Sequence, residues 1–342
     1  MNNFFYDLFF SPNEDDDSDE APKKKKQIHN IVDKTFLLTN ELEKTRLLKQ
    51  LPNWQQYFYL FDTATPIRLA EVSEDLKVEQ CKTKCNEVLL SYDSRKLIYI
   101  DSYLKALSCS RKYISKLIDF YKSSLATIQQ LNAKGIAHNN INFNTLLVDE
   151  NENVLLTNFA FSLSLMREGN QDKNNLSLLL PFYKDDDKDT DTSLFLPVEF
   201  HLLRYQLTNG ITCLSFNNIE SVLKQFVSNH RILTHFDTTV LLKDGLSYFN
   251  KYVNQNLLET MAPTFETWDN YALSIVFLRI LIGLHKTIKI NNKFIIHFMK
   301  LLFKNISLDV SKRLSLNETR EQFELLLNKI DLDDFVKLVC AI

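Results

Sequence analysis

The sequence predicts an α+β fold in two parts, a small strand-rich part followed by a larger helical part. Short β-branched and aromatic runs, typical of strands, gather before residue 103. Beyond that point apolar residues recur at steps of three and four, which indicates amphipathic helices. With 342 residues, 45% of them hydrophobic, the chain can bury a large core without help from metals or disulfides.

Residues 1–27 are predicted to be a mobile tail outside this core. Six of the seven residues 14–20 are acidic, and residues 23–26 are four lysines, so this stretch is too charged to pack. Residues 4–10 are different, because five of these seven are aromatic. We expect this aromatic stretch to dock onto the domain or onto a partner.

The small part, residues 28–103, is expected to contain one helix and several antiparallel strands. Asn40 and Glu43 have the spacing of a capping box, which predicts a helix that continues to Leu51 and stops at Pro52. Runs rich in β-branched and aromatic residues predict strands over residues 56–61, 67–72, 87–92 and 96–100.

The large part, residues 104–342, begins with a long predicted helix over residues 114–131 that Gly135 ends. Two short strands, 145–148 and 154–157, follow on either side of an acidic turn. Residues 170–195 are acidic and rich in turn formers, so they are expected to form an exposed loop. Further helices are expected over residues 218–229, 244–258, 268–284, 294–304 and 317–330.

Composition argues against several functional classes. A net charge of -3 gives no general attraction to phosphate backbones, so a nucleic-acid partner is not expected. Five cysteines with one close pair, Cys81 and Cys85, make neither a disulfide framework nor a zinc pattern. The longest apolar stretch, residues 271–284, is interrupted by Arg279 and falls short of the ~20 residues of a membrane span. We expect a soluble intracellular protein.

The functional prediction depends on two short motifs. Residues 138–145 read H-N-N-I-N-F-N-T and residues 158–160 read N-F-A. They resemble the H-R-D-L-x-x-x-N and D-F-G motifs of protein kinases. His138 and Asn158 are 158 - 138 = 20 residues apart, as these two motifs are in that family.

Three later segments match the same family in the same order. Residues 196–199, L-P-V-E, resemble the A-P-E motif; residues 267–274 resemble the helix that begins D-x-W-S-L-G; and residues 308–314 resemble D-P-x-x-R-x-T. The resemblance covers roughly residues 40–325 and implies a bilobal protein kinase-like fold with a helical insertion over about 205–262.

The resemblance also implies scaffold roles for five residues. His138 and Phe159 would stack in a column between the lobes, and Asp269 would hold the backbone of the catalytic loop. Glu199 would form a buried ion pair with Arg313, a pair that is costly to break singly.

The catalytic positions themselves have changed. Asn140 replaces the aspartate that accepts the substrate proton, Asn142 replaces a lysine, and Thr145 and Asn158 replace the two magnesium ligands. An amide is too weak a base to take a proton near neutral pH, and neutral oxygens are poor ligands for Mg²⁺. These substitutions predict no catalysis, no bound metal and no cofactor.

The ATP-binding elements are also missing. Five glycines, at 135, 169, 210, 245 and 283, are too far apart to form a glycine-rich phosphate loop. Residues 31–34, I-V-D-K, are the nearest match to the V-A-I-K lysine motif, but Lys34 lies only nine residues before Glu43. Glu43 is therefore interpreted as a capping residue, with the helix glutamate of the family as the alternative.

The favoured function is a pseudokinase, a kinase-like protein that binds protein partners or has a structural role in a larger assembly. An asparagine-rich composition is typical of AT-rich genomes such as those of large DNA viruses, so a virus particle or the host cytoplasm is the expected location. Two alternatives stay open. One is a nucleotide-binding switch without phosphoryl transfer, and the other is a divergent serine/threonine kinase that uses acids such as Asp149 or Glu152.

Overall fold

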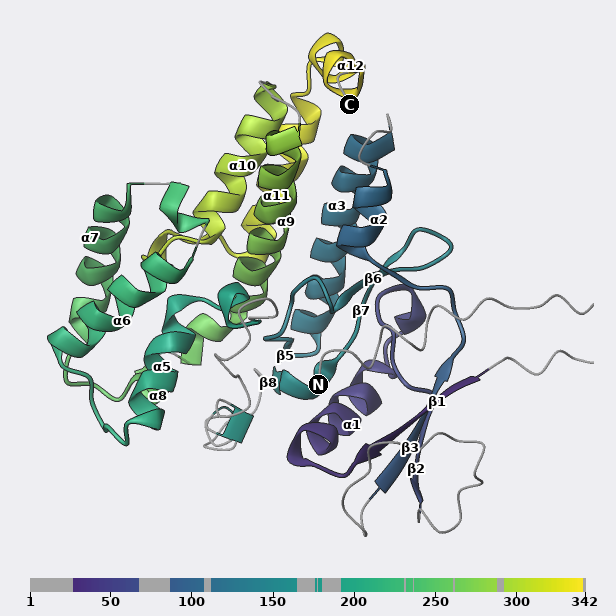
Figure 1. The fold of residues 1–342 in the computed structure, drawn as a ribbon, viewed down its shortest axis with the longest axis horizontal. Coiled ribbons are helices and arrows are strands. Elements are labelled where there is room, and N and C mark those ends of the chain that lie inside the picture. Colours follow the sequence, from purple (N-terminus) through teal and green to yellow (C-terminus); the bar gives the residue numbers. More distant parts are fainter. Residues whose placement is uncertain are drawn as a thin grey trace, which may run out of the picture.

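The computed structural model describes residues 27–67, 87–107, 112–164, 176, 178–179, 192–230, 232–235, 237–260, 262–287 and 292–340. In this part of the chain helices predominate, and the strands form three small antiparallel sheets (Figure 1). The predicted α+β class is confirmed. Almost all of the predicted tail and most of the acidic loop 170–195 lie outside the described residues.

The N-terminal sheet has the order β1-β3-β2, so β3 (Glu87–Asp93) is central between β1 (Gln27–Asp33) and β2 (Thr63–Ile67). Helix α1 (Phe36–Leu48) follows β1 after a two-residue turn and lies beside the sheet (Figure 1). A small apolar cluster joins the two, with Leu38, Phe61, Val88 and Leu90 at its centre.

The start of α1 corrects the sequence prediction. Thr35 is the N-cap, because its hydroxyl accepts the N–H of Leu38, and the helix ends at Leu48 rather than Leu51. The predicted capping box of Asn40 and Glu43 is therefore wrong. Asn40 lies inside the helix, where its amide is free to reach residues distant in sequence.

The strand predictions differ from the structure in three places, and the first is β2, which ends at Ile67 where the predicted strand 67–72 begins. β1 was not predicted, since the expected small part began with its helix. Residues 56–61 are not a strand: a short 3-10 helix, η1 (Trp54–Gln56), is followed by a single parallel bridge from Phe58 to Leu156. Residues 68–86, which include most of the predicted strand 67–72 and both Cys81 and Cys85, lie outside the described residues.

The second part of the chain begins with two small sheets around one long helix. β4 (Ile98–Tyr99), β6 (Leu146–Val148) and β7 (Val154–Leu156) form one sheet, and β5 (Ile136–Ala137) pairs with β8 (Leu163–Ser164). The helices and 3-10 turns that accompany them are α2 (Ile100–Ala106), α3 (Lys112–Ala133), η3 (Phe159–Phe161) and η5 (Thr192–Phe195).

The remaining chain is helical. Its α-helices are α5 (Val198–Thr208), α6 (Phe216–Asn229), α7 (Thr238–Phe249), α8 (Leu257–Thr260), α9 (Trp268–Thr287), α10 (Lys293–Asn305), α11 (Leu316–Asn328) and α12 (Leu332–Cys340). Its 3-10 turns are η6 (Leu233–His235), η7 (Asn250–Tyr252), η8 (Ala262–Thr267) and η9 (Val310–Lys312).

Most of the predicted helices are confirmed within a few residues, including the long helix before Gly135. Gly135 has a positive φ of 63°, which favours glycine at a helix end. The prediction of one helix over residues 244–258 is wrong, because the chain there forms the end of α7, then η7, then α8. Asn254, between η7 and α8, has a φ of 61° that no helix allows.

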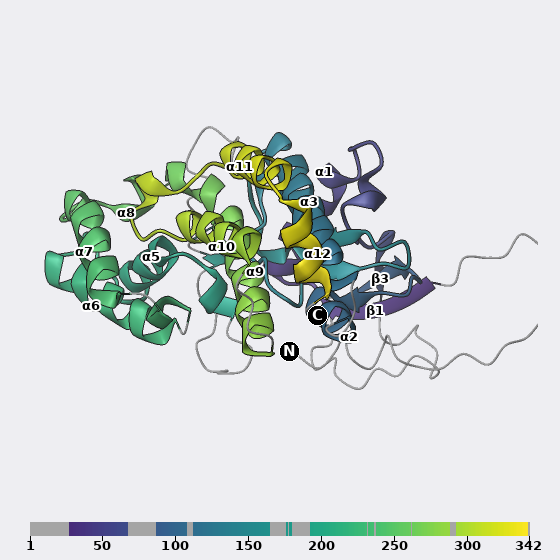
Figure 2. The same cartoon turned by 90° about the horizontal axis from the view of Figure 1, so that it is seen from above.

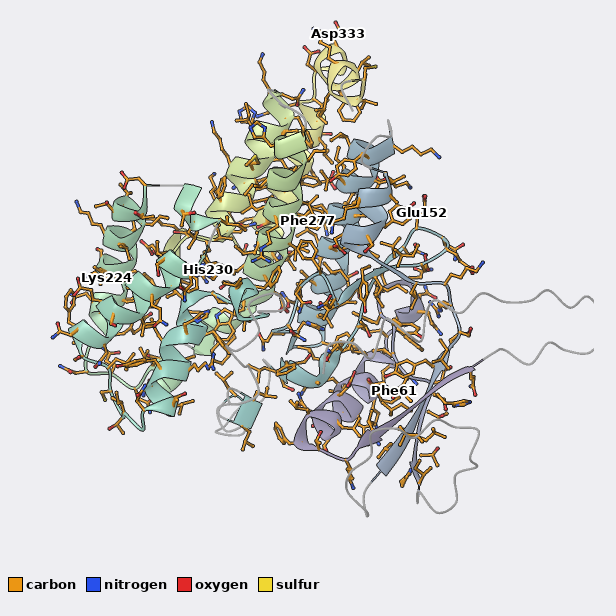
Figure 3. All side chains as sticks on the ribbon, in the orientation of Figure 1. Phe61, Glu152, Lys224, His230, Phe277 and Asp333 are labelled. Carbon is orange, nitrogen blue, oxygen red and sulfur yellow. The ribbon has the colours of Figure 1, made fainter. Side chains whose placement is uncertain are left out.

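Aromatic packing holds the helical part together. The ring of Tyr121 on α3 meets those of Phe277, Phe298 and Phe323 edge to face, with centroids 4.7 to 4.9 Å apart. These three rings come from α9, α10 and α11, which lie side by side with α3 in both views (Figures 1 and 2). Phe277 points into this interior, whereas Lys224 and Asp333 point outward (Figure 3).

Helix α9 lies at the centre of this core. With the preceding turn it forms a stretch, Thr264–His285, that is long and apolar enough to cross a membrane. Within the described residues no other helix meets that test. Because 78% of its most apolar window is buried inside the protein, α9 has the character of a core helix rather than of a membrane span.

Replacement of Phe298 by alanine should destabilise the protein strongly. Phe298 is fully buried, so its removal leaves a cavity and should lower the free energy of unfolding by roughly 3 to 5 kcal/mol. Ile296, two residues earlier on α10, is 39% exposed, and Ile296→Ala should cost less than about 1 kcal/mol. Urea unfolding of both variants measures the difference. Equal losses would contradict the position of α10 in the core.

Candidate functional site

The two expected motifs lie side by side in the structure. β5 precedes the loop of residues 138–145, β8 follows the segment 158–162, and these two strands pair through Ile136 and Ser164. The N–H of Thr157 also donates to the carbonyl oxygen of Thr145 over 3.1 Å. The chain therefore brings together at one place residues that are twenty positions apart.

His138 joins the two segments through its ring. Its centroid is 4.9 Å from that of Phe159, in an edge-to-face arrangement. Nε2 lies 3.0 Å from the carbonyl oxygen of Thr157, and Nδ1 lies 3.3 Å from the N–H of Asn140. Nδ1 must accept and Nε2 must donate, which requires a neutral ring. Burial lowers the pKa of His138 to about 4, in agreement with this requirement.

Asp269 supports the loop from the first turn of α9. One carboxylate oxygen accepts the N–H of His138 over 2.6 Å, and the other accepts the N–H of Asn139 over 2.8 Å. The backbone of Asn139 has a φ of 57°, an unfavourable conformation that these bonds help to hold. Burial raises the pKa of Asp269 to about 6, while the two N–H donors oppose this shift.

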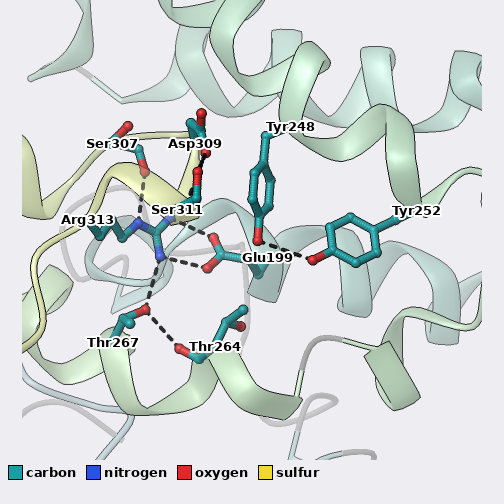
Figure 4. Close-up of polar contacts among 9 residues, drawn as sticks. All are labelled: Glu199, Tyr248, Tyr252, Thr264, Thr267, Ser307, Asp309, Ser311 and Arg313. Atoms are coloured by element: carbon teal, nitrogen blue, oxygen red, sulfur yellow. Dashed lines mark hydrogen bonds and ion pairs between the residues drawn. The ribbon is translucent and has the colours of Figure 1, made fainter.

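Glu199 and Arg313 form a buried, bidentate ion pair (Figure 4). The two guanidinium N–H groups donate to the two carboxylate oxygens over 2.6 and 2.8 Å. The Arg313 Nε also donates to the carbonyl oxygen of Ser307, so the guanidinium has several partners away from water. This pair ties the start of α5 to the segment before α11, and it is the pair that the resemblance implies.

The side chains of Asn140, Asn142 and Thr145 hydrogen-bond within their own loop. The Asn142 amide donates to the side-chain and backbone oxygens of Asn140 over 3.0 and 2.8 Å. The Thr145 hydroxyl lies 3.0 Å from the Asn140 carbonyl oxygen and accepts the N–H of Asn142 at the same distance. All three side chains are buried. Their polar atoms build the loop and are turned toward each other.

Asn158 follows directly after Thr157 and has a φ of 66° and a ψ of 73°. Asparagine tolerates this left-handed conformation better than most residues. The chain then enters η3, in which Phe159 is fully buried and Ala160 nearly so.

A group of polar residues on α1, which the sequence interpretation missed, contacts this second segment. The amide of Asn40 donates to the carbonyl oxygens of Ala160 and Ser162 over 2.8 and 2.9 Å. The ammonium group of Lys44, a side chain only 1% exposed, donates to the hydroxyl of Ser164 over 2.5 Å.

Glu41 belongs to the same face of α1. Its carboxylate accepts a backbone hydrogen bond from Phe159, and burial raises its pKa to about 7. A signal for this face exists in the sequence, because Glu41 and Lys44 fall on the same three- and four-residue steps as the buried Leu38, Thr45 and Leu48.

The capping role expected for Glu43 is not present, because Thr35 is the N-cap of α1. The Glu43 side chain is 40% exposed, and its carboxylate lies 3.9 Å from the Lys44 ammonium. Lys34, the lysine nearest to the V-A-I-K pattern, is exposed just after β1.

The N-terminal part is fastened to the same site by residues 57–59. The N–H of Tyr59 donates to Leu156, and the N–H of Leu156 donates to Tyr57, so this stretch runs along β7. The fully buried ring of Phe58 meets Phe159 edge to face, with centroids 5.7 Å apart. Protein side chains therefore fill the space against Phe159.

Asp149 and Glu152, the acids considered for a divergent enzyme, are used in the turn between β6 and β7. Asp149 accepts the backbone N–H groups of Asn151 and Asn153 over 2.9 and 2.8 Å. Glu152 accepts from Tyr103 and pairs with Lys116. Within the described residues no three His, Cys, Asp or Glu side chains gather as a metal site would need.

No family model matches this chain, and no curated protein sequence matches it either.

Removal of either partner of the Glu199–Arg313 pair should be strongly destabilising. Glu199→Ala or Arg313→Ala leaves a buried charge without its partner, and each should lower the free energy of unfolding by roughly 3 to 5 kcal/mol. The double variant should cost clearly less than the sum of the two. Chemical unfolding of the three variants measures the coupling. Lys224→Ala, at a surface pair with Glu220, should change stability by less than about 0.5 kcal/mol as a control.

The stability difference between Glu41→Gln and the unchanged protein should depend on pH. The raised pKa means that the folded protein holds the Glu41 proton more tightly than the unfolded chain does. The contribution of Glu41 to the free energy of unfolding is therefore fully present below about pH 4.5, and it is lost as the pH rises to about 7. Glutamine cannot ionise, so the variant should gain roughly 2 to 3 kcal/mol relative to the unchanged protein between pH 5 and pH 8. Urea unfolding at both pH values tests this, and a constant difference would contradict it.

Proposed function

We propose that this chain is a bilobal, protein kinase-like protein that does not transfer phosphoryl groups. In this proposal it acts as a protein-binding or structural component, a pseudokinase. The small lobe would be the β1-β3-β2 sheet with α1, and the large lobe would be the helical part.

Three contacts support the kinase-like fold, because the resemblance implies each of them. They are the stacking of His138 on Phe159, the capture of the loop backbone by Asp269, and the buried pair of Glu199 with Arg313. The residues involved are up to 131 positions apart, so their agreement does not follow from local sequence.

The main observation in support of the proposed lack of activity is that Asn140, Asn142 and Thr145 hydrogen-bond to one another. A general base needs a free lone pair of suitable pKa that points at the substrate. A magnesium ligand needs an oxygen that is free to turn to the metal, usually a charged one. The side chains of Asn140, Asn142 and Thr145 are neutral, and the Asn140 amide oxygen, the Asn142 amide and the Thr145 hydroxyl are engaged within the loop.

The lysine arrangement supports the same conclusion. In kinases a strand lysine contacts the α- and β-phosphates and pairs with a glutamate of the neighbouring helix. In this chain Lys34 is exposed beyond β1, while the buried Lys44 comes from α1 itself and binds Ser164. A lysine held in this way anchors the helix rather than a nucleotide.

The place of action proposed for this protein is a larger assembly, such as a virus particle, or the cytoplasm of an infected cell. The asparagine-rich composition supports this location, as does the loss of catalytic groups while the scaffold is retained.

Incubation of the protein with Mg²⁺ or Mn²⁺, labelled ATP and general protein substrates should give no transfer above background. The reason is that proton acceptor, metal ligands and phosphate loop are all replaced, and each contributes orders of magnitude to the rate. Heat-denatured protein gives the background. Reproducible transfer that Asn158→Ala abolishes would refute the proposal.

Thermal unfolding with ATP, in the presence and absence of EDTA, separates the pseudokinase from a nucleotide-binding switch. A ligand that binds the folded state raises the unfolding temperature by mass action. We expect no increase, because protein side chains already pack against Phe159. A saturable, EDTA-resistant increase would favour the switch.

A further inference from the structure

Helices α10 and α11 enclose a groove that shares no residue with the candidate site. The two helices lie side by side in both views (Figures 1 and 2). Each side of the groove is one helical stripe with the spacing i, i+3, i+4 and i+7, and the volume between the stripes is about 300 Å³. The stripe on α10 is His297, Lys300, Leu301 and Lys304. The opposite stripe, from α11 and the residue after it, is Gln322, Leu325, Leu326 and Lys329.

A lysine lies at each end of the groove, with leucines between them. The ammonium group of Lys304 is 3.4 Å from the side-chain oxygen of Gln322, so the last residue of one stripe lies beside the first residue of the other. The two stripes therefore run in opposite directions, which places Lys304 and Lys329 at opposite ends. Seven residues along a helix span about 10 Å, or two turns. The groove is therefore long enough for a short peptide segment.

The three lysines of the groove, Lys300, Lys304 and Lys329, are exposed and have no acidic partner among the residues that the structure describes. The lining of the groove contains no Asp or Glu. Elsewhere on the helical part exposed lysines are paired, as in the contact of Lys224 with Glu220 over 2.8 Å. The groove therefore presents three positive charges that an acidic ligand can neutralise.

The leucines distinguish between classes of acidic ligand. Leu301 is 3% exposed on the floor of the groove, whereas Leu325 is 54% exposed at its rim. Phosphate groups of a nucleic acid would leave these apolar surfaces uncovered. Binding to a bilayer needs apolar side chains that protrude into it, and Leu301 does not protrude. An apolar side chain of a peptide can enter the groove and cover both leucines, while acidic side chains beside it reach the lysines.

We propose that the groove between α10 and α11 binds an acidic segment of a partner protein, in which an aromatic or aliphatic side chain lies between the acids. The apolar side chain packs on Leu301 and Leu325. The acids before and after it pair with Lys304 and Lys329 at the two ends of the groove.

This proposal deepens the protein-binding role proposed above and rests on it, because it states the chemistry of the partner. The groove takes no part in phosphoryl transfer. A failure of the peptide-binding experiment below is therefore distinguishable from a failure of the transfer assay.

Fluorescence anisotropy of a labelled synthetic peptide, titrated with the full chain, tests the proposal. The peptide contains one tryptophan with three acidic residues on each side. Binding should be saturable, and it should weaken as NaCl is raised because the ammonium groups are exposed. Lys300→Glu with Lys304→Glu should weaken binding about tenfold or more. Leu325→Ser should weaken it about fivefold, because the tryptophan loses apolar contact area.

Matched controls separate the groove from general charge attraction. A peptide with serine in place of tryptophan should bind about fivefold more weakly. A peptide with lysines in place of the acids should bind the Lys300→Glu, Lys304→Glu variant more tightly than the unchanged protein. Lys224→Glu with Lys243→Glu changes two exposed lysines outside the groove and should leave binding unchanged. Circular dichroism confirms that each variant is folded.

Three results would overturn the proposal. The first is the absence of saturable binding of the acidic tryptophan peptide. The second is binding that neither Leu325→Ser nor the charge-reversed groove weakens, because the peptide then binds elsewhere. The third is displacement of the peptide by phosphatidylserine vesicles that bind through Lys300 and Lys304, which would make the groove a lipid-binding surface.

Discussion

The capture of two backbone N–H groups by the carboxylate of Asp269 is the constraint on which the candidate site depends. A buried carboxylate is costly to desolvate, and charge-assisted hydrogen bonds of 2.6 and 2.8 Å offset that cost. The bonds fix the turn at His138 and Asn139, where the backbone has a positive φ. Asp269 lies on α9, the central core helix, and the aromatic packing around Phe277 holds this helix in place. The loop bound to Asp269 is therefore held in place as well.

From this fixed turn the loop keeps its shape through amide and hydroxyl groups. An asparagine side chain both donates and accepts, so Asn142 donates to the two Asn140 oxygens while its own oxygen accepts the N–H of Asn144. A carboxylate in the same place only accepts and would attract cations or protons. Amide and hydroxyl groups at these positions therefore give the loop internal hydrogen bonds in place of a charge.

Helix α1 secures the other side of the site. Asn40 and Glu41 bind the backbone of residues 159–162, and Lys44 binds Ser164, so one helical face makes polar contacts along the whole segment. Burial of an ammonium group and of a carboxyl in this way has an energetic cost, and the raised pKa of Glu41 shows that the cost is only partly offset. The contacts hold the N-terminal part against the helical part at a fixed position.

The sequence by itself determined helices α3, α6, α9, α10 and α11 and the end of α3 at Gly135, because these depend on local periodicity. It also indicated the partners of His138, Asp269 and Glu199, through the resemblance to kinases. Tertiary structure alone decided that β1 is a strand, since its pairing partner β3 begins 54 residues after β1 ends. It also decided the role of Asn40, whose acceptors are 120 and 122 residues away. Local propensity cannot distinguish a helix cap from a distant contact. The groups that stabilise the distant contact come together only in the folded chain.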